Sequence, residues 1–354
     1  MKKCISIILV LIMFICLLGG CSNNENTPSE SEAEQSAQET PEQTAKGAQV
    51  AICIAPINHP VHRIVQMGFV QRAEELGMDG IVSGLDDGSM QENMAKYESA
   101  VTNGAQGILL WTGDDTYYNM MKSLKEVGVY IVVPHFAHNY NDTKGFIDKN
   151  ITALAAEYGE EAAKFVLDAL AEKGVTNGSI GITQAGANVT ENAASDAFRS
   201  YILNSGTGFT VIDTVFEGGE VTEATAKITA IIASNPDIVA GFGTTGGSCQ
   251  SWAAAMENTG RTDIVMLGVD YTELNLNLIA EGRVSGIIAQ PLISEAGKSA
   301  EALYALLSGE TFNGSAETWQ EVLEAPIVTA DGEGENGLDP YYDIIKQTKE
   351  YYGR

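Results

Sequence analysis

The chain has 354 residues, of which 44% are hydrophobic, and its formal net charge is −27. This hydrophobic content is ample for ordinary folded cores. The strong negative charge disfavours nucleic acids and anionic membrane surfaces as partners, because both would repel the protein.

The first residues have the pattern of a secretory signal. Lys2 and Lys3 form a positive start, residues 5–18 are an apolar run, and small residues precede Cys21. We predict a signal peptide over residues 1–20, with an uncleaved signal anchor as the alternative. Removal of the two lysines with the signal changes the formal net charge from −27 to −29.

The sequence Leu-Gly-Gly-Cys at residues 18–21 resembles the lipobox of bacterial lipoproteins, whose cysteine is diacylated and becomes the mature N-terminus. The resemblance implies that Cys21 is a lipid anchor, which would hold the protein on the outer face of the cytoplasmic membrane. Stable attachment requires more than one acyl chain. Residues 21–47 contain no aromatic or large aliphatic side chain and are predicted to form a disordered tether.

From Gln49 onward, apolar runs typical of buried parallel strands alternate with helical patterns. The expected strands are residues 50–55, 80–83, 107–111 and 129–134, and the expected helices are residues 63–76, 90–102 and 116–127. This alternation predicts right-handed βαβ units in a doubly wound parallel sheet.

The same alternation starts again in the second half of the chain. The expected strands are residues 180–183, 210–216, 238–242, 264–269 and 284–289, and the expected helices are residues 153–173, 191–203, 222–233 and 248–259. A folded part of about 300 residues suggests two domains, so we predict an α/β protein of two Rossmann-like lobes. Open α/β sheets bind ligands at the carboxyl ends of their strands.

Polar and aromatic side chains follow the predicted strands. They lie at residues 56–62, 135–136, 184–192, 243–248, 270–271 and 290. Most can hydrogen-bond hydroxyl groups in fixed directions, and Phe136, Tyr271 and Trp111 can stack on apolar ring faces. A few polar groups with flat aromatic walls suit a neutral polyhydroxylated ligand.

Three motifs are similar to those of type I periplasmic binding proteins, the ribose and galactose binders above all. They are Asn-x-Pro at residues 58–60, Leu-Gly-Val-Asp at residues 267–270 and Ile-Ile-Ala-Gln-Pro at residues 287–291. The resemblance covers residues 48 to about 328 and implies the solute-binding component of an ABC importer for a carbohydrate-like ligand. Matched residue by residue, it implies ligand contacts at His59, His62, His135, Phe136, Asn192, Thr245, Asp270 and Gln290.

Several of these positions depart from the family pattern. Residues 61–62 replace a pair of aromatics, residues 135–136 replace Asp-Arg, Asn192 replaces an arginine and Thr245 replaces an asparagine. Asp270 and Gln290 are unchanged. The departures suggest a different ligand, such as a polyol, a furanose or a small sugar-derived signal.

The resemblance also implies how the chain is divided. The N-terminal lobe would comprise residues 48–149 and 291–320, and the C-terminal lobe residues 150–290 and 321–354. Three chain crossings, expected near residues 146–149, 290 and 321–323, would form a hinge. Ligand bound between the lobes would favour a closed form, which a membrane permease would recognise.

Other functions remain open from the residues alone. A ligand sensor of the same fold would pass occupancy to a signalling partner. A transition-metal receptor would use His59, His62 and His135, because the histidines are spaced i, i+3 in two loops. No nucleophile–base pair can be placed beside Asp270, so we expect no enzyme and no cofactor. Asp270 and Gln290 point to hydroxyl groups on the ligand, so we expect no resident metal. We expect a monomer.

Overall fold

The computed structural model describes residues 45–87 and 89–353. The predicted signal peptide at residues 1–20, the predicted lipid anchor Cys21 and most of the predicted tether lie outside the described residues. The described chain begins at Ala45, which is buried, and Gly47 N donates to Gly77 O at 2.7 Å. Contacts with the first lobe therefore begin before residue 48, where the folded part was expected to start.

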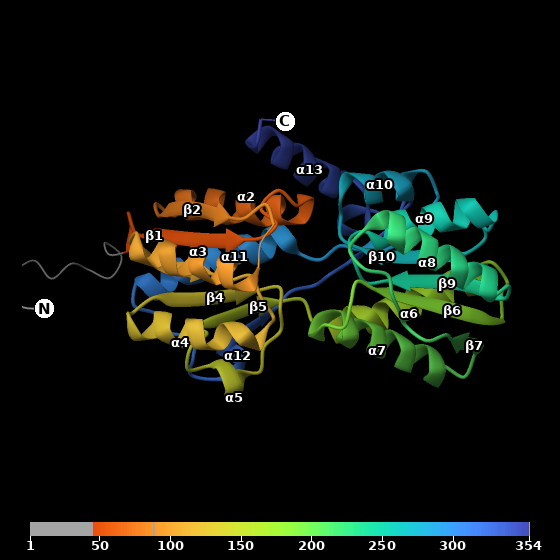
Figure 1. Ribbon diagram of the computed structural model, residues 1–354, viewed down its shortest axis with the longest axis horizontal. Coiled ribbons are helices and arrows are strands. Elements are labelled where there is room, and N and C mark those ends of the chain that lie inside the picture. Colours follow the sequence, from red (N-terminus) through yellow and green to blue (C-terminus); the bar gives the residue numbers. More distant parts are fainter. Residues whose placement is uncertain (1–44, 88, 354) are drawn as a thin grey trace, which may run out of the picture. The chain divides into compact units, whose positions relative to one another are not determined.

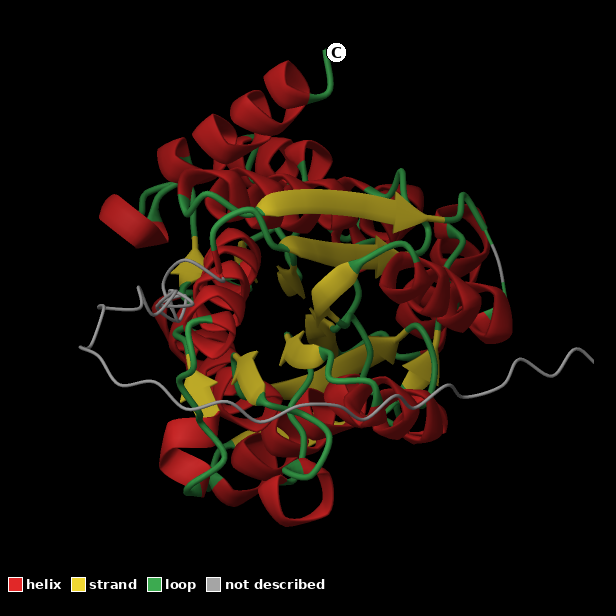
Figure 2. Ribbon diagram, turned by 90° about the vertical axis from the view of Figure 1, so that its left-hand side faces the viewer, coloured by secondary structure: helices red, strands yellow, loops and turns green. Residues whose placement is uncertain are grey.

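The first lobe is built on a six-stranded sheet with the order β12-β5-β4-β3-β1-β2 and parallel neighbours throughout. Its strands are β1 (Gln49–Ile54), β2 (Asp79–Gly84), β3 (Ala105–Leu109), β4 (Tyr130–Pro134), β5 (Lys149–Thr152) and β12 (Gln320–Val322). Its helices are α2 (Pro60–Glu75), α3 (Met90–Thr102), η1 (Asp115–Tyr117), α4 (Tyr118–Glu126), α5 (Tyr140–Thr143), α11 (Leu292–Leu307) and α12 (Ala316–Trp319). Figure 2, seen from the side of this lobe, shows the strands between helices.

The second lobe is built on a seven-stranded sheet with the order β13-β11-β10-β9-β6-β7, in which β8 also pairs with β6. Its strands are β6 (Asn177–Gln184), β7 (Gly208–Val211), β8 (Val215–Phe216), β9 (Ile238–Gly243), β10 (Val265–Val269), β11 (Gly286–Ile288) and the antiparallel β13 (Ile327–Val328). Its helices are α6 (Ala155–Glu172), α7 (Val189–Asn204), α8 (Val221–Ser234), α9 (Ser248–Thr259), α10 (Glu273–Ala280) and η2 (Gly334–Asn336). Helices α8 and α9 pack together on one face, and α6 and α7 on the other (Figure 1).

These two sheets confirm the predicted α/β fold of two Rossmann-like lobes. The chain passes between them at residues 153–154, 289–291 and 323–326. The first sheet includes Thr152 and Val322, so two crossings lie slightly later in the chain than residues 146–149 and 321–323, where they were expected.

Local sequence explains the helices that were predicted most closely. Helix α3 begins after Ser89, whose side chain accepts from Glu92 N while the Glu92 carboxylate accepts from Ser89 N. This capping box satisfies two backbone donors at the start of the helix. Helix α9 ends before Gly260, whose φ of 67° lies in the left-handed region that glycine adopts easily.

The strand predicted at residues 210–216 is divided in two. The carbonyls of Val211 and Ile212 accept from the Arg199 guanidinium at 3.3 and 2.9 Å, and Thr214 Oγ1 accepts from it at 2.9 Å. Ile212 N still donates to Ile180 O of β6 at 3.0 Å, but the carbonyl of Ile212 and the side chain of Thr214 bond to Arg199 of helix α7, where the strand is interrupted.

Helix α13 (Asp339–Tyr351) contacts both lobes. Following it, Tyr352 donates from its hydroxyl to Gln66 Oε1 of α2 at 2.8 Å. At its other end, the Tyr341 ring lies 4.8 Å from the Tyr271 ring of the second lobe. Residues 321–354 were expected with the second lobe, but the end of this segment packs against the first.

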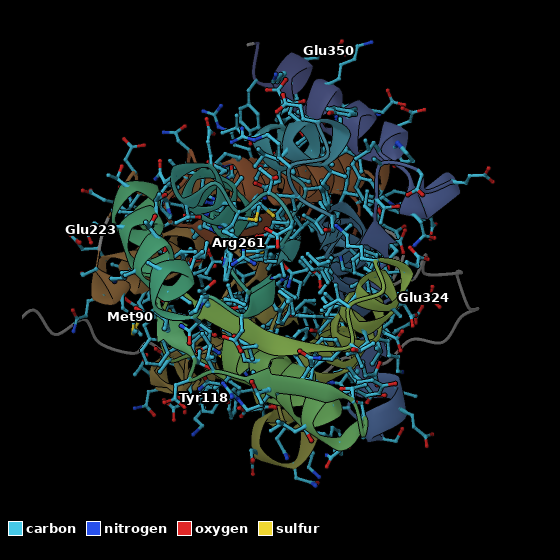
Figure 3. All side chains as sticks on the ribbon, turned by 90° about the vertical axis from the view of Figure 1, so that its right-hand side faces the viewer. Met90, Tyr118, Glu223, Arg261, Glu324 and Glu350 are labelled. Atoms are coloured by element: carbon cyan, nitrogen blue, oxygen red, sulfur yellow. The ribbon has the colours of Figure 1, made fainter. Side chains whose placement is uncertain are left out.

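The chain has 47 Asp and Glu residues against 20 Lys and Arg residues. Glu223, Glu324 and Glu350 are exposed and extend outward in Figure 3. In the described part of the chain, no helix combines the length and the apolar character that crossing a bilayer requires.

Candidate functional site

A cavity of about 870 Å³ is lined by residues of both lobes, and we call it the main cavity. The first lobe contributes residues 111–115 and Tyr118, which follow β3, and residues 135–139, which follow β4. The second lobe contributes Tyr158 of α6 together with residues 187–191, 244–245, 270 and 290, which follow its strands. The cavity therefore lies where ligands of open α/β sheets bind.

The loop after β4 is held by buried hydrogen bonds. His135 has a φ of 70°, a region that costs most side chains energy but that histidine adopts more often. Its carbonyl accepts from Thr152 Oγ1 at 2.8 Å, and the carbonyl of Phe136 accepts from Asn150 Nδ2 at 2.8 Å. These bonds from β5 fix the direction in which both side chains point.

Aromatic rings form one wall of the main cavity. The rings of Trp111 and His135 are stacked with their centroids 4.6 Å apart, and Phe136 meets Trp111 edge-on at 5.6 Å. Gly113 makes room for this wall, since a Cβ there would lie 2.9 Å from Phe136 Cδ1. The wall offers a flat surface to an apolar ring face.

His135 is paired with a buried carboxylate. Its Nδ1 lies 3.1 Å from Glu295 Oε2, and the Glu295 side chain is 0% exposed. Burial lowers the pKa of His135, but the charge of Glu295, its hydrogen bond and the charge of Asp270 outweigh burial and leave the pKa raised. His135 therefore carries more positive charge near neutral pH than an ordinary histidine.

Asp270 is fixed in position, but its carboxylate has an unsatisfied oxygen. Its backbone is left-handed with a φ of 67°, and Asn275 Nδ2 donates to its carbonyl at 3.0 Å and to that of Gly246 at 2.9 Å. Its Oδ1 is enclosed, and no hydrogen-bond partner for it exists among the described residues. Burial raises the pKa of Asp270 to about 6, against the lowering effect of His135.

An enclosed carboxylate oxygen without a donor costs free energy until a donor reaches it. A Cβ at Gly246 would lie 2.8 Å from Asp270 Oδ2, so glycine leaves this side of the carboxylate open. The arrangement is suited to a ligand that donates hydrogen bonds to Asp270.

Gln290, Tyr158 and Glu191 complete the second-lobe wall. Gln290 Nε2 lies 3.3 Å from the Tyr158 hydroxyl. Glu191 Oε2 accepts from Ala185 N and from Thr244 Oγ1, each at 2.8 Å. Glu191 lines the cavity and Asn192, the residue expected there, does not, because successive helical residues point in directions about 100° apart.

Thr245 and His138 line the main cavity while bonding within the protein. Thr245 Oγ1 donates to Glu217 Oε1 at 3.3 Å and accepts from Gly247 N at 3.2 Å. His138 was expected at the loop surface, but it is buried, with Nε2 3.1 Å from Thr112 O and Nδ1 3.2 Å from the Tyr118 hydroxyl. Burial lowers the pKa of His138.

A second cavity of about 500 Å³, which we call the α13 cavity, lies beside the C-terminal helix. It is lined by the start of α2 with His59 and Arg63, by the start of α10 with Glu273, and by Lys349 of α13. His62 lines neither cavity: its ring lies between those of His59, at 4.9 Å, and Trp111, at 6.0 Å.

The His62 ring is held in one tautomer. Its Nδ1 lies 2.8 Å from the carbonyl of Pro56, which can only accept, so Nδ1 carries the proton. Burial lowers the pKa of His62 to about 4, so the ring is neutral at pH 7.

The predicted ligand residues are thus divided between several places. His135, Phe136, Thr245, Asp270 and Gln290 line the main cavity, His59 lines the α13 cavity, and His62 and Asn192 line neither. Glu191, Tyr158 and Tyr118 line the main cavity without having been predicted. Glu191 had a signal in the sequence, since an acid three residues after Asn188 marks a helix start.

Across the described ranges, no group of three or more His, Cys, Asp or Glu side chains is arranged to hold a metal ion. The metal-receptor alternative therefore receives no support from these residues.

Comparisons with known proteins give a consistent result. Residues 50–311 match the family described as periplasmic binding protein domain. The D-apiose import binding protein of Actinobacillus succinogenes is 22% identical over 250 residues, which cover 70% of this chain and 78% of that protein.

Two solved structures are similar in fold. The sugar-binding protein of a sugar ABC transporter from Bacillus halodurans has a TM-score of 0.73 at 17% identity and covers 83% of this chain and 100% of its own. The arabinose-binding protein AraP of Geobacillus stearothermophilus has a TM-score of 0.72 at 16% identity, and the match covers 84% of this chain and 99% of AraP. At such identities the likeness concerns the fold alone.

Proposed function

The chain belongs to the periplasmic binding protein family, and we propose that it is the solute-binding component of a bacterial ABC importer. It captures a small carbohydrate-like ligand in the main cavity and delivers it to a membrane permease. Relatives named for D-apiose import, sugar binding and arabinose binding support this assignment. The family is one of binding proteins, in agreement with the prediction that the chain is not an enzyme.

One observation carries the proposal: the main cavity brings together strand-end side chains of both lobes around an unpartnered carboxylate oxygen. Its volume of about 870 Å³ falls within the range of small-molecule sites. Asp270 accepts from the ligand, Gln290 can donate and accept, and Trp111 with Phe136 offers ring faces. This set of groups matches a compact ligand with several hydroxyls.

The division of the site between two lobes supplies the mechanism. A ligand held by His135 and Phe136 on one side and by Asp270 and Gln290 on the other binds best when the lobes approach it together. Binding therefore favours a closed arrangement by differential affinity, and the three crossings between the sheets act as the hinge. The permease recognises the closed arrangement.

Attachment to the membrane belongs to the same proposal. Cys21 carries the lipid, and the protein works as a monomer on the outer face of the cytoplasmic membrane. Labelling of growing cells with a radioactive fatty acid tests the anchor: label in the unchanged protein and none in Cys21→Ser is expected. Equal label in both would remove Cys21 from the proposal.

A thermal-shift screen of the purified protein against sugars, polyols and nucleosides tests ligand capture. A ligand at about 100 times its Kd adds about 2.7 kcal/mol of stability, which raises Tm by several degrees. We expect a shift with a carbohydrate and a smaller shift in Asp270→Asn at the same ligand concentration. A shift with none of the carbohydrates would overturn the proposal.

A further inference from the structure

The main cavity is acidic. Its lining includes the carboxylates of Asp114, Asp115, Glu191 and Asp270, and none of its described lining residues is a lysine or an arginine. Asp114 and Asp115 are exposed, whereas Glu191 and Asp270 are only partly exposed. A bound molecule therefore meets negative charge from both lobes.

The histidines of the lining do not balance this charge. His135 is paired with the buried Glu295, so its positive charge is matched beneath the cavity wall. His138 is buried, its Nε2 bonds to a carbonyl, and burial lowers its pKa, so it is neutral near pH 7. Glu191 and Asp270 form no ion pair among the described residues, and the charge of His135, which acts on Asp270, is shared with Glu295.

Asp270 points to a ligand independently of this charge count. Its Oδ1 is enclosed, yet it accepts no hydrogen bond within the described structure. Glu191 differs, because its oxygens accept from Ala185 N, Thr244 Oγ1 and Asn188 Nδ2. A donor from outside therefore satisfies Asp270, and a cationic donor adds Coulomb attraction to the hydrogen bond with the carboxylate.

The aromatic side chains favour the same kind of ligand. Trp111, Tyr118, Phe136 and Tyr158 line the main cavity together with the carboxylates. Aromatic faces attract cations through their quadrupole, and they attract neutral apolar faces as well. A sugar acid or sugar phosphate would instead bring a second negative charge into an enclosed space beside Asp270.

We propose that the main cavity selects a carbohydrate-like ligand that carries a protonated amine, with the ammonium group held by Asp270 and Glu191 against the aromatic wall. This inference rests on the proposed function and names the class of ligand for the same site. The ammonium supplies the donor that Asp270 Oδ1 lacks and offsets one of the two negative charges of the wall when the lobes close. Neutral and acidic molecules of the same skeleton bind less well.

Isothermal titration of matched ligands tests the inference. Hexoses, pentoses and polyols are each compared as neutral, amino and carboxylate forms, for example D-glucose, D-glucosamine and D-glucuronate. We expect the amino form to bind at least about 10-fold more tightly than the neutral form, since an ammonium adds the attraction of a full positive charge to the hydrogen bond that a hydroxyl also donates to the carboxylate. Raising NaCl from about 0.05 to about 0.5 M should reduce this preference.

Two variants sharpen the result. Asp270→Asn leaves the size of the side chain unchanged, and asparagine tolerates the left-handed backbone as aspartate does. The variant should abolish the preference for the amine. Glu273→Gln removes a carboxylate of the α13 cavity and should leave the preference unchanged. The salt dependence of the unmodified protein decides the question on its own if Asp270→Asn does not fold.

The outcomes separate this inference from the proposed function. A neutral sugar that binds as tightly as its amino form, or a preference that survives in Asp270→Asn at every salt concentration, overturns the charge selection and leaves the binding protein intact. Binding of none of the carbohydrates, in any charge state, overturns both.

Discussion

The two cavities of this protein differ in whether their carboxylates are paired with a cation of the protein. In the α13 cavity, Lys349 Nζ lies 2.6 Å from both carboxylate oxygens of Glu273, and the Arg63 guanidinium lies 4.8 Å from the centre of the Tyr352 ring. In the main cavity, Asp270 has an enclosed oxygen with no donor in the described structure. The carboxylate of Glu273 in the α13 cavity therefore has a cation bonded to it within the protein, and the carboxylate of Asp270 has none among the described residues. The enclosed unsatisfied atom of the α13 cavity is a donor, Arg63 Nε, and that of the main cavity is an acceptor, Asp270 Oδ1.

The difference shows how burial and pairing distinguish a charge that contributes to the fold from a charge that is available to a ligand. A paired surface charge contributes little to stability, and a ligand must break the pair to use it. An enclosed unpaired carboxylate costs stability in the free protein, and a ligand recovers that cost by donating to it. Cavity size alone would not separate the two sites, but the pairing of their carboxylates does.

The largest expected effect comes from removing the unpaired charge. Asp270→Asn should weaken ligand binding by about 10- to 100-fold, because a bond to a charged group contributes about 1.5–3 kcal/mol. Titration calorimetry measures the change, and Glu273→Gln is the matched control in the α13 cavity. Equal losses in both variants would mean that the two cavities do not differ in the way described.

Acidification should act on the same group. Asp270 has its pKa raised by burial to about 6, so its carboxylate is ionised at pH 7 and mostly protonated at pH 5. His135 becomes more cationic over the same range, while Glu295 and Glu191 face Asp270 with like charge. Affinity for an amino ligand should fall about 10-fold from pH 7 to pH 5. Affinity that is constant over this range, or that rises on acidification, would contradict the role of the ionised carboxylate.

Protonation of Asp270 weakens binding of an amino ligand, but the same protonation should stabilise the free protein. The pKa of Asp270 is higher in the folded than in the unfolded chain, so its ionisation above pH 6 destabilises the fold and its protonation relieves this. Asp270→Asn should therefore raise Tm at pH 7.5, with a gain of about 1–2 kcal/mol that disappears toward pH 4. Thermal melts without ligand at the two pH values measure it, and a lower Tm at pH 7.5 would count against an unpaired carboxylate.

The next largest loss of ligand affinity is expected from removing a ring of the aromatic wall. Trp111→Ala removes the stacking partner of His135 and the edge contact of Phe136, and it should weaken binding by about 5- to 10-fold, as aromatic contacts contribute about 0.5–1.5 kcal/mol beyond area. Titration calorimetry of Trp111→Phe, which keeps a ring, should show a smaller loss. Unchanged affinity in the alanine variant would exclude the wall from the site.

The smallest expected effect comes from removing the hydrogen bond that joins the end of α13 to α2. Tyr352→Phe removes the hydroxyl that donates to Gln66 at 2.8 Å and keeps the ring beneath Arg63. It should lower the free energy of unfolding by about 0.5–1.5 kcal/mol. Ligand affinity should change less than about 2-fold, because this contact is not part of the main cavity. A large loss of affinity would show that α13 controls how the lobes close.

Much of the fold could be predicted from residues alone. The resemblance to periplasmic binding proteins is confirmed by the family match, and the α/β alternation by the two sheets. Helices α3 and α9 were predicted to the residue, because a capping box and a terminal glycine are local signals. The strand ends at His135, Asp270 and Gln290 could be located because a polar residue after an apolar run marks the carboxyl end of a buried strand.

Other parts of the site depended on neighbours far away in the chain. Glu191 and Asn192 are adjacent in sequence, and only the packing of α7 decides which of them faces the cavity. His59 precedes α2 and His62 lies in its first turn, yet the first lines the α13 cavity and the second lies between His59 and Trp111. The spacing i, i+3 could not separate these environments, because exposure depends on what packs over a helix.

The sequence by itself therefore determined the class of fold, the starts and ends of its best helices and the polar residues that follow its strands, since these depend on contacts among near neighbours. Tertiary structure alone decided that the Asp270 carboxylate has an oxygen without a partner while Lys349 and Glu273 are paired, and that α13 returns to α2. The physical reason is that hydrogen-bond satisfaction and burial are properties of groups brought together from distant segments, and no local pattern specifies them.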